Sequence, residues 1–133
     1  MVKLLSIVAA SVMLFADMAS ALFDASNKRV EYLTDANFEE KVLKSDEAWI
    51  IKFYAPWCGH CKQLAPSWEK AGKALKGVVR VGAIDVDQHK AIGGKYGVQG
   101  FPTIKYFGLN KKSSPSDYQG GRTADAIVNY ALD

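Results

Sequence analysis

The 133-residue sequence is poor in cysteine, with Cys58 and Cys61 as its only two. Two cysteines are too few for the disulfide framework that stabilises many small secreted domains. A bond between them closes so short a loop that it constrains the unfolded chain very little. We therefore interpret the pair as a disulfide that forms and breaks, rather than as a structural bridge.

An excess of charge of one sign is also missing. The 17 Lys and Arg residues are nearly balanced by 14 Asp and Glu residues, which leaves a net charge of +3. This balance gives no indication of a nucleic-acid partner or of binding to an anionic membrane surface. A four-ligand zinc site would need both histidines, His60 and His89, beside the two cysteines, although His60 lies between them. We therefore expect no metal site.

The N-terminal apolar run, Leu4–Phe15, is too short for a membrane anchor, which needs about 20 apolar residues. Asp17 interrupts it, and the small residues Ala19–Ala21 suit a signal peptidase. We expect residues 1–21 to be a cleaved signal peptide and residues 22–133 to form a single domain. The mature chain would then enter the secretory pathway, where thiols meet oxidising conditions.

Apolar patterning divides the rest of the chain into strands and helices. The run 48–54 is almost continuously apolar, as in a strand covered on both faces. Leu64, Trp68, Ala71 and Leu75 form the apolar stripe of an amphipathic helix. We expect further strands at 30–33, 78–84, 104–107 and 118–119, and further helices capped by Thr34, Asp87 and Thr123. This order predicts an α/β fold in which helices flank both faces of a central mixed β-sheet.

The two cysteines fall where the expected strand at 48–54 gives way to a helix. Disulfide exchange needs a thiolate, and Cys58 at the first helical position would lie beside free N–H groups and the positive end of the helix dipole. Gly59 is expected to allow a tight turn that leaves the sulfur accessible, and a protonated His60 to add positive charge. Cys61, one turn further in, suits the role of resolving thiol. Because thiolate stabilisation makes the disulfide a stronger oxidant, His60 favours oxidation of substrates.

Three segments carry a resemblance to a known family. Phe53–Lys62 resembles the active-site signature of protein disulfide isomerases. Tyr96–Thr103 resembles their cis-proline loop, and Tyr118–Arg122 the turn before their final helix. The resemblance extends from about Val30 to Leu132 and is strongest to the first catalytic domain of the A6-type, thioredoxin-like members. It implies a thioredoxin fold.

The resemblance also implies roles for individual residues. Cys58 would be the nucleophile, and Pro102 would be cis and face the cysteines. The Phe101 backbone would pair with an extended substrate segment, while Trp57 and Phe101 would offer an apolar surface to unfolded chains. Arg122 matches an arginine that swings towards the resolving cysteine and lowers its pKa; the alternative is a solvated turn residue, because arginine is usually exposed.

Lys52 departs from the family pattern. Many members carry a buried Glu or Asp six residues before the first cysteine, as a proton acceptor for the resolving thiol. Strand alternation puts Lys52 on the same face as Ile50 and Tyr54. Either its side chain extends to water, or it is a buried amine with a lowered pKa that relays the proton of Cys61.

Together these features predict a thiol–disulfide oxidoreductase and isomerase of the endoplasmic reticulum lumen. Its substrates would be unfolded or misfolded secretory proteins, and glutathione or a thiol oxidase would be its redox partner. No cofactor is needed, because the cysteine pair is the redox group. The chain ends without a retention signal, so secretion is the alternative destination. The alternative function is a non-catalytic, chaperone-like module that binds unfolded chains.

Overall fold

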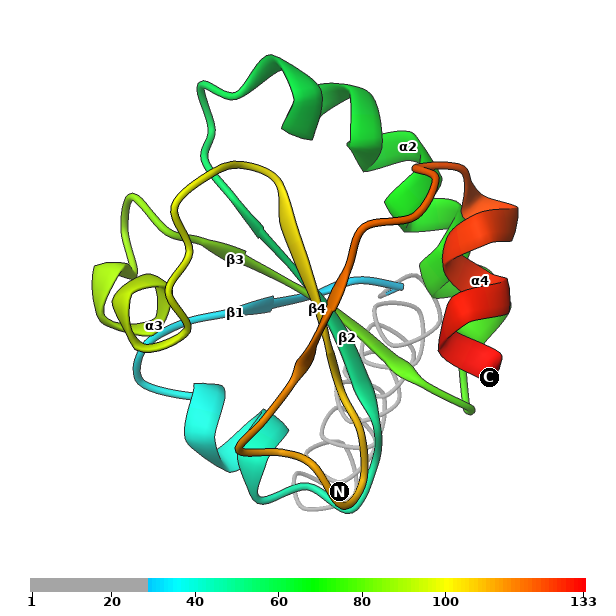
Figure 1. Ribbon diagram of the computed structural model, residues 1–133, viewed down its shortest axis with the longest axis horizontal. Coiled ribbons are helices and arrows are strands. Elements are labelled where there is room, and N and C mark those ends of the chain that lie inside the picture. Colours follow the sequence, from blue (N-terminus) through cyan, green and yellow to red (C-terminus); the bar gives the residue numbers. More distant parts are fainter. Residues whose placement is uncertain (1–28) are drawn as a thin grey trace, which may run out of the picture.

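The computed structural model describes residues 29–133, which contain a five-stranded mixed sheet (Figure 1). The strand order is β1-β3-β2-β4-β5, with β2 in the centre. The pairs β1·β3 and β2·β3 are parallel, and β2·β4 and β4·β5 are antiparallel. The strands are β1 (Glu31–Leu33), β2 (Trp49–Tyr54), β3 (Arg80–Asp85), β4 (Thr103–Phe107) and β5 (Ser116–Tyr118).

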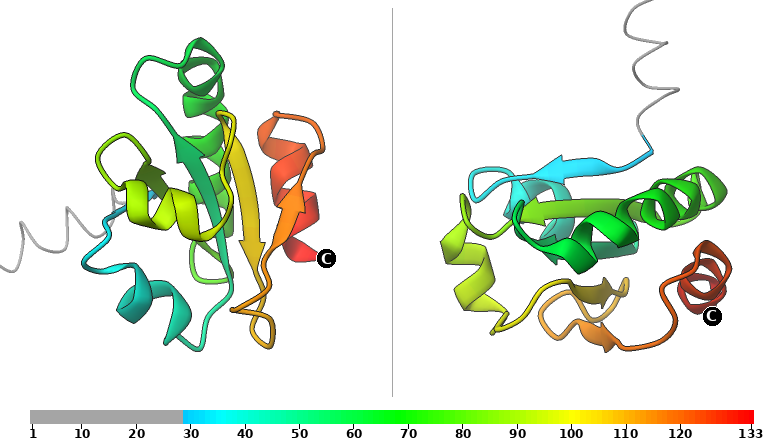
Figure 2. Two further views of the ribbon diagram at one scale, coloured as in Figure 1. Left: turned by 60° about the vertical axis from the view of Figure 1, so that its left-hand side comes forward. Right: turned by 90° about the horizontal axis from the view of Figure 1, so that it is seen from above.

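Helices cover both faces of this sheet, as Figure 1 and Figure 2 show. Their bounds are η1 (Glu39–Leu43, a π-helix), α2 (Gly59–Leu75), α3 (Lys90–Lys95) and α4 (Ala124–Leu132). On one face the residues Leu64 and Trp68 of α2 and Ile127 of α4 share a core with Ile50 of β2. On the other face Phe38, Val42 and Ile92 pack with Trp49, Ile51 and Phe53. The predicted α/β class, mixed sheet and two covered faces are confirmed.

Strand β2 is buried on both faces, which explains its nearly continuous apolar sequence. Side chains alternate along it as predicted, so Ile50 faces α2 and Ile51 faces η1 and α3. The indole Nε1 of Trp68 donates a hydrogen bond to the Gly82 carbonyl of β3, 3.0 Å away. This bond satisfies the buried indole and ties the middle of α2 to the sheet.

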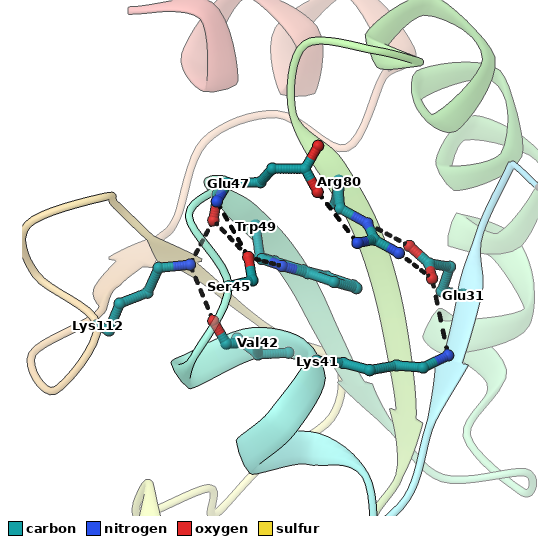
Figure 3. Close-up of polar contacts among 8 residues, drawn as sticks. All are labelled: Glu31, Lys41, Val42, Ser45, Glu47, Trp49, Arg80 and Lys112. Carbon is teal, nitrogen blue, oxygen red and sulfur yellow. Dashed lines mark hydrogen bonds and ion pairs between the residues drawn. The ribbon is translucent and has the colours of Figure 1, made fainter.

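A polar network fixes the ends of the strands far from the cysteines (Figure 3). Arg80, at the start of β3, donates to Glu31 at 2.7 Å and to Glu47 at 3.0 Å. Its guanidinium lies 4.5 Å from the ring centroid of Trp49, and Lys112 donates to the Glu47 carbonyl. These contacts join β1, β2 and β3 at their N-terminal ends, which leaves the carboxyl ends of β2 and β3 for the cysteine site.

Three helix starts differ from the prediction. Thr34 caps no helix: its hydroxyl accepts from the Asn37 N–H in the turn after β1, and η1 begins only at Glu39, with Phe38 as its N-cap. Cys58 is the N-cap of α2 rather than its first helical residue, because its own side chain accepts a backbone hydrogen bond. Asp87 caps no helix: the carboxylate of Asp85 accepts from the Asp87 and Gln88 N–H groups, and α3 begins only after His89. The carboxylate of Asp85 thus satisfies the N–H groups of the turn after β3, and the side chain of Asp87 is free to contact another residue. Thr123 caps α4 as predicted.

The expected signal peptide, residues 1–21, and the first part of the expected domain, residues 22–28, lie outside the described residues. Within residues 29–133, no helix has the length and apolar character needed to cross a bilayer.

Two neighbouring glycines of α3 offer a matched test of how tightly this helix packs beside the loop that carries Asp87. A Cβ on Gly93 would lie 2.4 Å from Cγ1 of Val86, whereas a Cβ on Gly94 would meet nothing within 4 Å. We expect Gly93→Ala to destabilise the fold by about 1–3 kcal/mol through overpacking. Gly94→Ala should stabilise it by up to about 1 kcal/mol through helix propensity. Denaturant unfolding measures both, and equal effects of the two substitutions would contradict this packing.

Candidate active site

The two cysteines lie at the junction of β2 and α2, and both thiols are free. The Cys61 N–H donates to Sγ of Cys58 at 3.1 Å, so Cys58 uses its sulfur where other N-caps use an oxygen. A sulfur in this position meets the unpaired N–H groups and the positive end of the helix dipole, both of which favour a thiolate. Cys58 therefore lies at the start of α2 as predicted, but at the N-cap, one position before the first helical residue.

The surroundings of Cys58 are less open than predicted. Its exposed fraction is only 6%, and that of Cys61 is 3%. Gly59 does not have the positive φ that favours glycine, and a Cβ there would meet open space. The turn therefore does not require glycine at position 59, and the sulfur is buried rather than accessible as expected. Burial of Cys58 arises from a distant segment, which the sequence near the cysteines does not reveal.

That segment is the loop before β4. The Cys58 thiol lies 3.5 Å from the carbonyl oxygen of Phe101, to which it can donate. The Phe101–Pro102 peptide bond is cis, as the resemblance implied. Next to this loop lies a groove of about 530 Å³, lined by residues that include Gln99, Pro102, Tyr118 and Arg122. A groove therefore runs from the cis-proline loop along β4 and β5, and neither cysteine lines it.

Trp57 forms an exposed wall beside Cys58, with 67% of its surface accessible. Its ring meets Phe101 edge to face, with centroids 5.7 Å apart. Its Nε1 donates to the carboxylate of Asp87 at 2.7 Å. The sequence-based prediction missed Asp87. A usable signal existed, because Tyr54 pairs with Asp85 in the parallel β2·β3 register, which brings the residues just after each strand together.

The environment of Cys61 opposes its ionisation. Burial raises the pKa of this thiol from its ordinary value of 9.0 to about 11, and the hydrogen bond with Cys58 acts in the same direction. A backbone hydrogen bond from Ala55 and the positive charge of Lys52 lower the pKa and so counter part of this effect. The two cysteines thus differ: Cys58 accepts a hydrogen bond at a helix start, while Cys61 holds its proton tightly.

Lys52 lies beneath the pair and is buried, with an exposed fraction of 6%. The alternative in which its side chain extends into open water is therefore wrong. Burial lowers the pKa of Lys52 from its ordinary value of 10.5, and the negative charges of Cys61 and Glu69 oppose this shift. Lys52 and Cys61 line the same small cavity of about 170 Å³. Glu69, which the sequence-based prediction missed, lies two turns further along α2.

Two candidate residues lie outside this cluster. His60 is exposed on the first turn of α2, and Arg122 is exposed on the segment before α4. Arg122 lines the groove beside Pro102, but it is not among the groups that shift the pKa of Cys61. Within residues 29–133 no three His, Cys, Asp or Glu side chains gather as metal ligands would.

Comparison with known proteins identifies the family of this chain. Residues 29–133 match the thioredoxin family. The chain is 58% identical over 113 residues to protein disulfide-isomerase A6 of Homo sapiens, which covers 85% of this chain and 25% of the relative. It is 60% identical over 100 residues to the protein disulfide-isomerase A6 homolog of Caenorhabditis elegans. That match covers 75% of this chain and 22% of the relative. The chain therefore spans about a quarter of the length of these curated relatives.

Solved structures agree with the sequence comparison. The first thioredoxin domain of mouse protein disulfide-isomerase A4 superposes with a TM-score of 0.70 at 40% identity, covering 79% of this chain and 74% of that domain. A crystal structure of ERdj5 gives a TM-score of 0.75 at 28% identity, covering 88% of this chain and 16% of that chain. The thioredoxin fold implied by the sequence resemblance is thus confirmed.

The burial of Lys52 predicts a pH-dependent cost to stability. In the folded protein the amine binds its proton less tightly than in the unfolded chain, so the cost is present at neutral pH and falls as pH rises towards 10.5. Lys52→Met should therefore stabilise the fold at neutral pH, by on the order of 1–4 kcal/mol, and the gain should shrink at alkaline pH. Urea unfolding of the oxidised protein, in which the thiols do not titrate, measures this difference. A gain that is independent of pH would contradict the argument.

The Asp87 contact predicts a loss of order at Trp57. Asp87→Ala removes the acceptor of the indole N–H, so the exposed ring should sample other rotamers and become more accessible. Trp49 and Trp68 are fully buried and provide an internal reference. Acrylamide quenching of tryptophan fluorescence should increase for the exposed fraction only. Unchanged quenching would mean that the Phe101 contact alone orders the ring.

Proposed function

The chain belongs to the thioredoxin family, as a disulfide-isomerase domain of the A6 type, and we propose that it is a thiol–disulfide oxidoreductase and isomerase acting on proteins through Cys58. The observation that carries this proposal is the position of Cys58. Its sulfur caps α2, lies within 3.5 Å of the Phe101 carbonyl and accepts a hydrogen bond from Cys61. A nucleophilic sulfur is thus held beside a second thiol and beside backbone that a substrate can reach.

The reaction proceeds in two exchanges. The Cys58 thiolate attacks one sulfur of a substrate disulfide, forms a mixed disulfide, and releases the other substrate sulfur as a thiolate that takes a proton from water. Cys61 then loses its proton and attacks Sγ of Cys58. The Cys58–Cys61 bond forms and the second substrate thiol leaves, so the substrate gains two electrons and the protein loses two. The reverse sequence oxidises a substrate dithiol, and release without net transfer rearranges disulfides.

Substrate contacts follow from the walls around Cys58. Trp57 and Phe101 offer apolar surface, and the groove next to Pro102 can take an extended segment that pairs with the Phe101 backbone. His60, at the exposed start of α2, adds positive charge to this entrance when protonated. Arg122 borders the same groove and approaches Cys61 only if its side chain moves from the position seen here.

The cellular setting is part of the proposal. The expected signal peptide directs the chain to the endoplasmic reticulum lumen. Secretory proteins with unpaired or mispaired cysteines are the substrates, and glutathione or a thiol oxidase resets the cysteine pair. The pair itself is the redox group, so the reaction needs no organic cofactor.

Paired serine substitutions test this function against chaperone-like binding. We expect Cys58→Ser to abolish refolding of a reduced, disulfide-containing substrate, since no mixed disulfide forms. Cys61→Ser should accumulate the mixed disulfide, because the resolving thiol is gone. Refolding yield and non-reducing mass analysis measure the two outcomes.

Suppression of aggregation of a cysteine-free substrate is the control, and the serine substitutions should leave it unchanged. If Cys58→Ser retains full refolding activity, the protein is a binding module and the proposed chemistry is wrong.

A further inference from the structure

We propose that Lys52 is the charge partner of Cys61, so that the buried ammonium holds the negative charge of the resolving thiolate when it attacks the mixed disulfide. This inference rests on the proposed function and specifies how its second step begins. Lys52 acts through Cys61 and is therefore a positioning residue.

Lys52 lacks the usual compensation for a buried charge. The other buried lysine, Lys105, is paired with the carboxylate of Asp117 at 2.5 Å. Within residues 29–133 no carboxylate lies within ion-pair distance of Lys52. Its amine instead lies 5.3 Å from the ring centroid of Tyr54. A buried, unpaired ammonium is costly, and an anion formed nearby during the reaction would compensate it.

Lys52 and Cys61 also share a cavity. Lys52 and Cys61 both line the space of about 170 Å³ between β2 and the first turns of α2, together with Tyr32, Tyr54, Ala55 and Pro56. Tyr32 is 61% exposed, so this wall lies at the molecular surface. The cavity is large enough for water. It therefore gives a proton released from Cys61 a path to the solvent.

Titratable groups from three elements face Lys52. From α2 these are Cys61 and Glu69, whose negative charges favour the ammonium, with Lys62 at the cavity wall and Cys58 beside Cys61. From β1 and β2 they are the phenols of Tyr32 and Tyr54. When Cys61 is a thiol, the pair of Cys61 and the Lys52 ammonium has a net charge of +1. When Cys61 is a thiolate, the net charge of the pair is zero. Release of one proton from Cys61 therefore removes the buried net charge of the pair.

This arrangement fixes the proton balance of the resolving step. The pair gives one proton to cavity water, and Lys52 keeps its own. The Cys61 thiolate attacks Sγ of Cys58, the Cys58–Cys61 bond forms, and the bond from Cys58 to the substrate sulfur breaks. The leaving substrate thiolate takes a proton from water. Overall, one disulfide and one thiol yield one disulfide and one thiol, so no further reactant is needed.

The test isolates the resolving step. Dithiodipyridine at acid pH converts Cys58 into a mixed disulfide with pyridinethiol, while Cys61 stays protonated. After a jump to higher pH, attack by Cys61 releases pyridinethione, whose absorbance gives the rate. We expect Lys52→Met to slow this release about tenfold or more at neutral pH, because each unit of pKa corresponds to a factor of ten. The midpoint of the rate–pH profile should also move to higher pH.

Lys105→Met is the matched control. It removes a buried lysine that does not line the cavity of Lys52 and Cys61, and it should keep the wild-type rate and midpoint. Lys52→Gln provides a second neutral variant in case Lys52→Met does not fold. If both neutral variants keep the wild-type rate and profile, the inference is wrong. If instead the wild-type protein fails to release pyridinethione after the jump, Cys61 is not the resolving thiol and the proposed function fails first.

Discussion

Negative charge on a buried sulfur is the constraint on which this structure depends. Cys58 and Cys61 are almost inaccessible, so water cannot stabilise their thiolates and the fold must do so. Cys58 uses the free N–H groups at the start of α2, and its sulfur accepts the Cys61 N–H. Cys61 lies further into the helix and cannot use that end. Lys52, on the central strand, is the cation whose charge lowers the pKa of Cys61.

The sheet topology brings these groups together. Strand β2 carries Lys52 and leads directly into the cysteine turn, while its parallel neighbour β3 ends beside it and supplies Asp87 to Trp57. Strand β4 runs antiparallel to β2, so the loop at its start arrives at the same end of the sheet and places the Phe101 carbonyl over Cys58. Ion pairs around Arg80 fix the opposite ends of the strands. Ion pairs therefore fix the strands at one end of the sheet, and the cysteine site lies at the other end.

The sequence patterns correctly predicted those features that depend on residues close together in the chain. The apolar run of β2 and the stripe of α2 are consequences of burial on a sheet, and both formed as expected. The capping residue Thr123 also acts within its own helix. The burial of Cys58 and the contact of Asp87 with Trp57 were not predicted, because both depend on residues far apart in the sequence. Phe101 lies 43 positions after Cys58, and Asp87 lies 30 positions after Trp57. In the sequence, Lys52 was recognisable only as a departure from the family pattern. Its burial could not be predicted without knowing where α2 lies in the fold.

The link between Lys52 and the ionisation of Cys61 is measured most directly by an NMR pH titration of the reduced protein. Carbon-13 is placed at the cysteine Cβ and lysine Cε positions. The account predicts that the Cys61 signal changes with an apparent pKa of about 11, well above the ordinary 9.0. It also predicts that the Lys52 signal responds over the same pH range, because the two groups share a cavity and a charge. A Cys61 signal that titrates near 9.0, with no response at Lys52, would contradict the account.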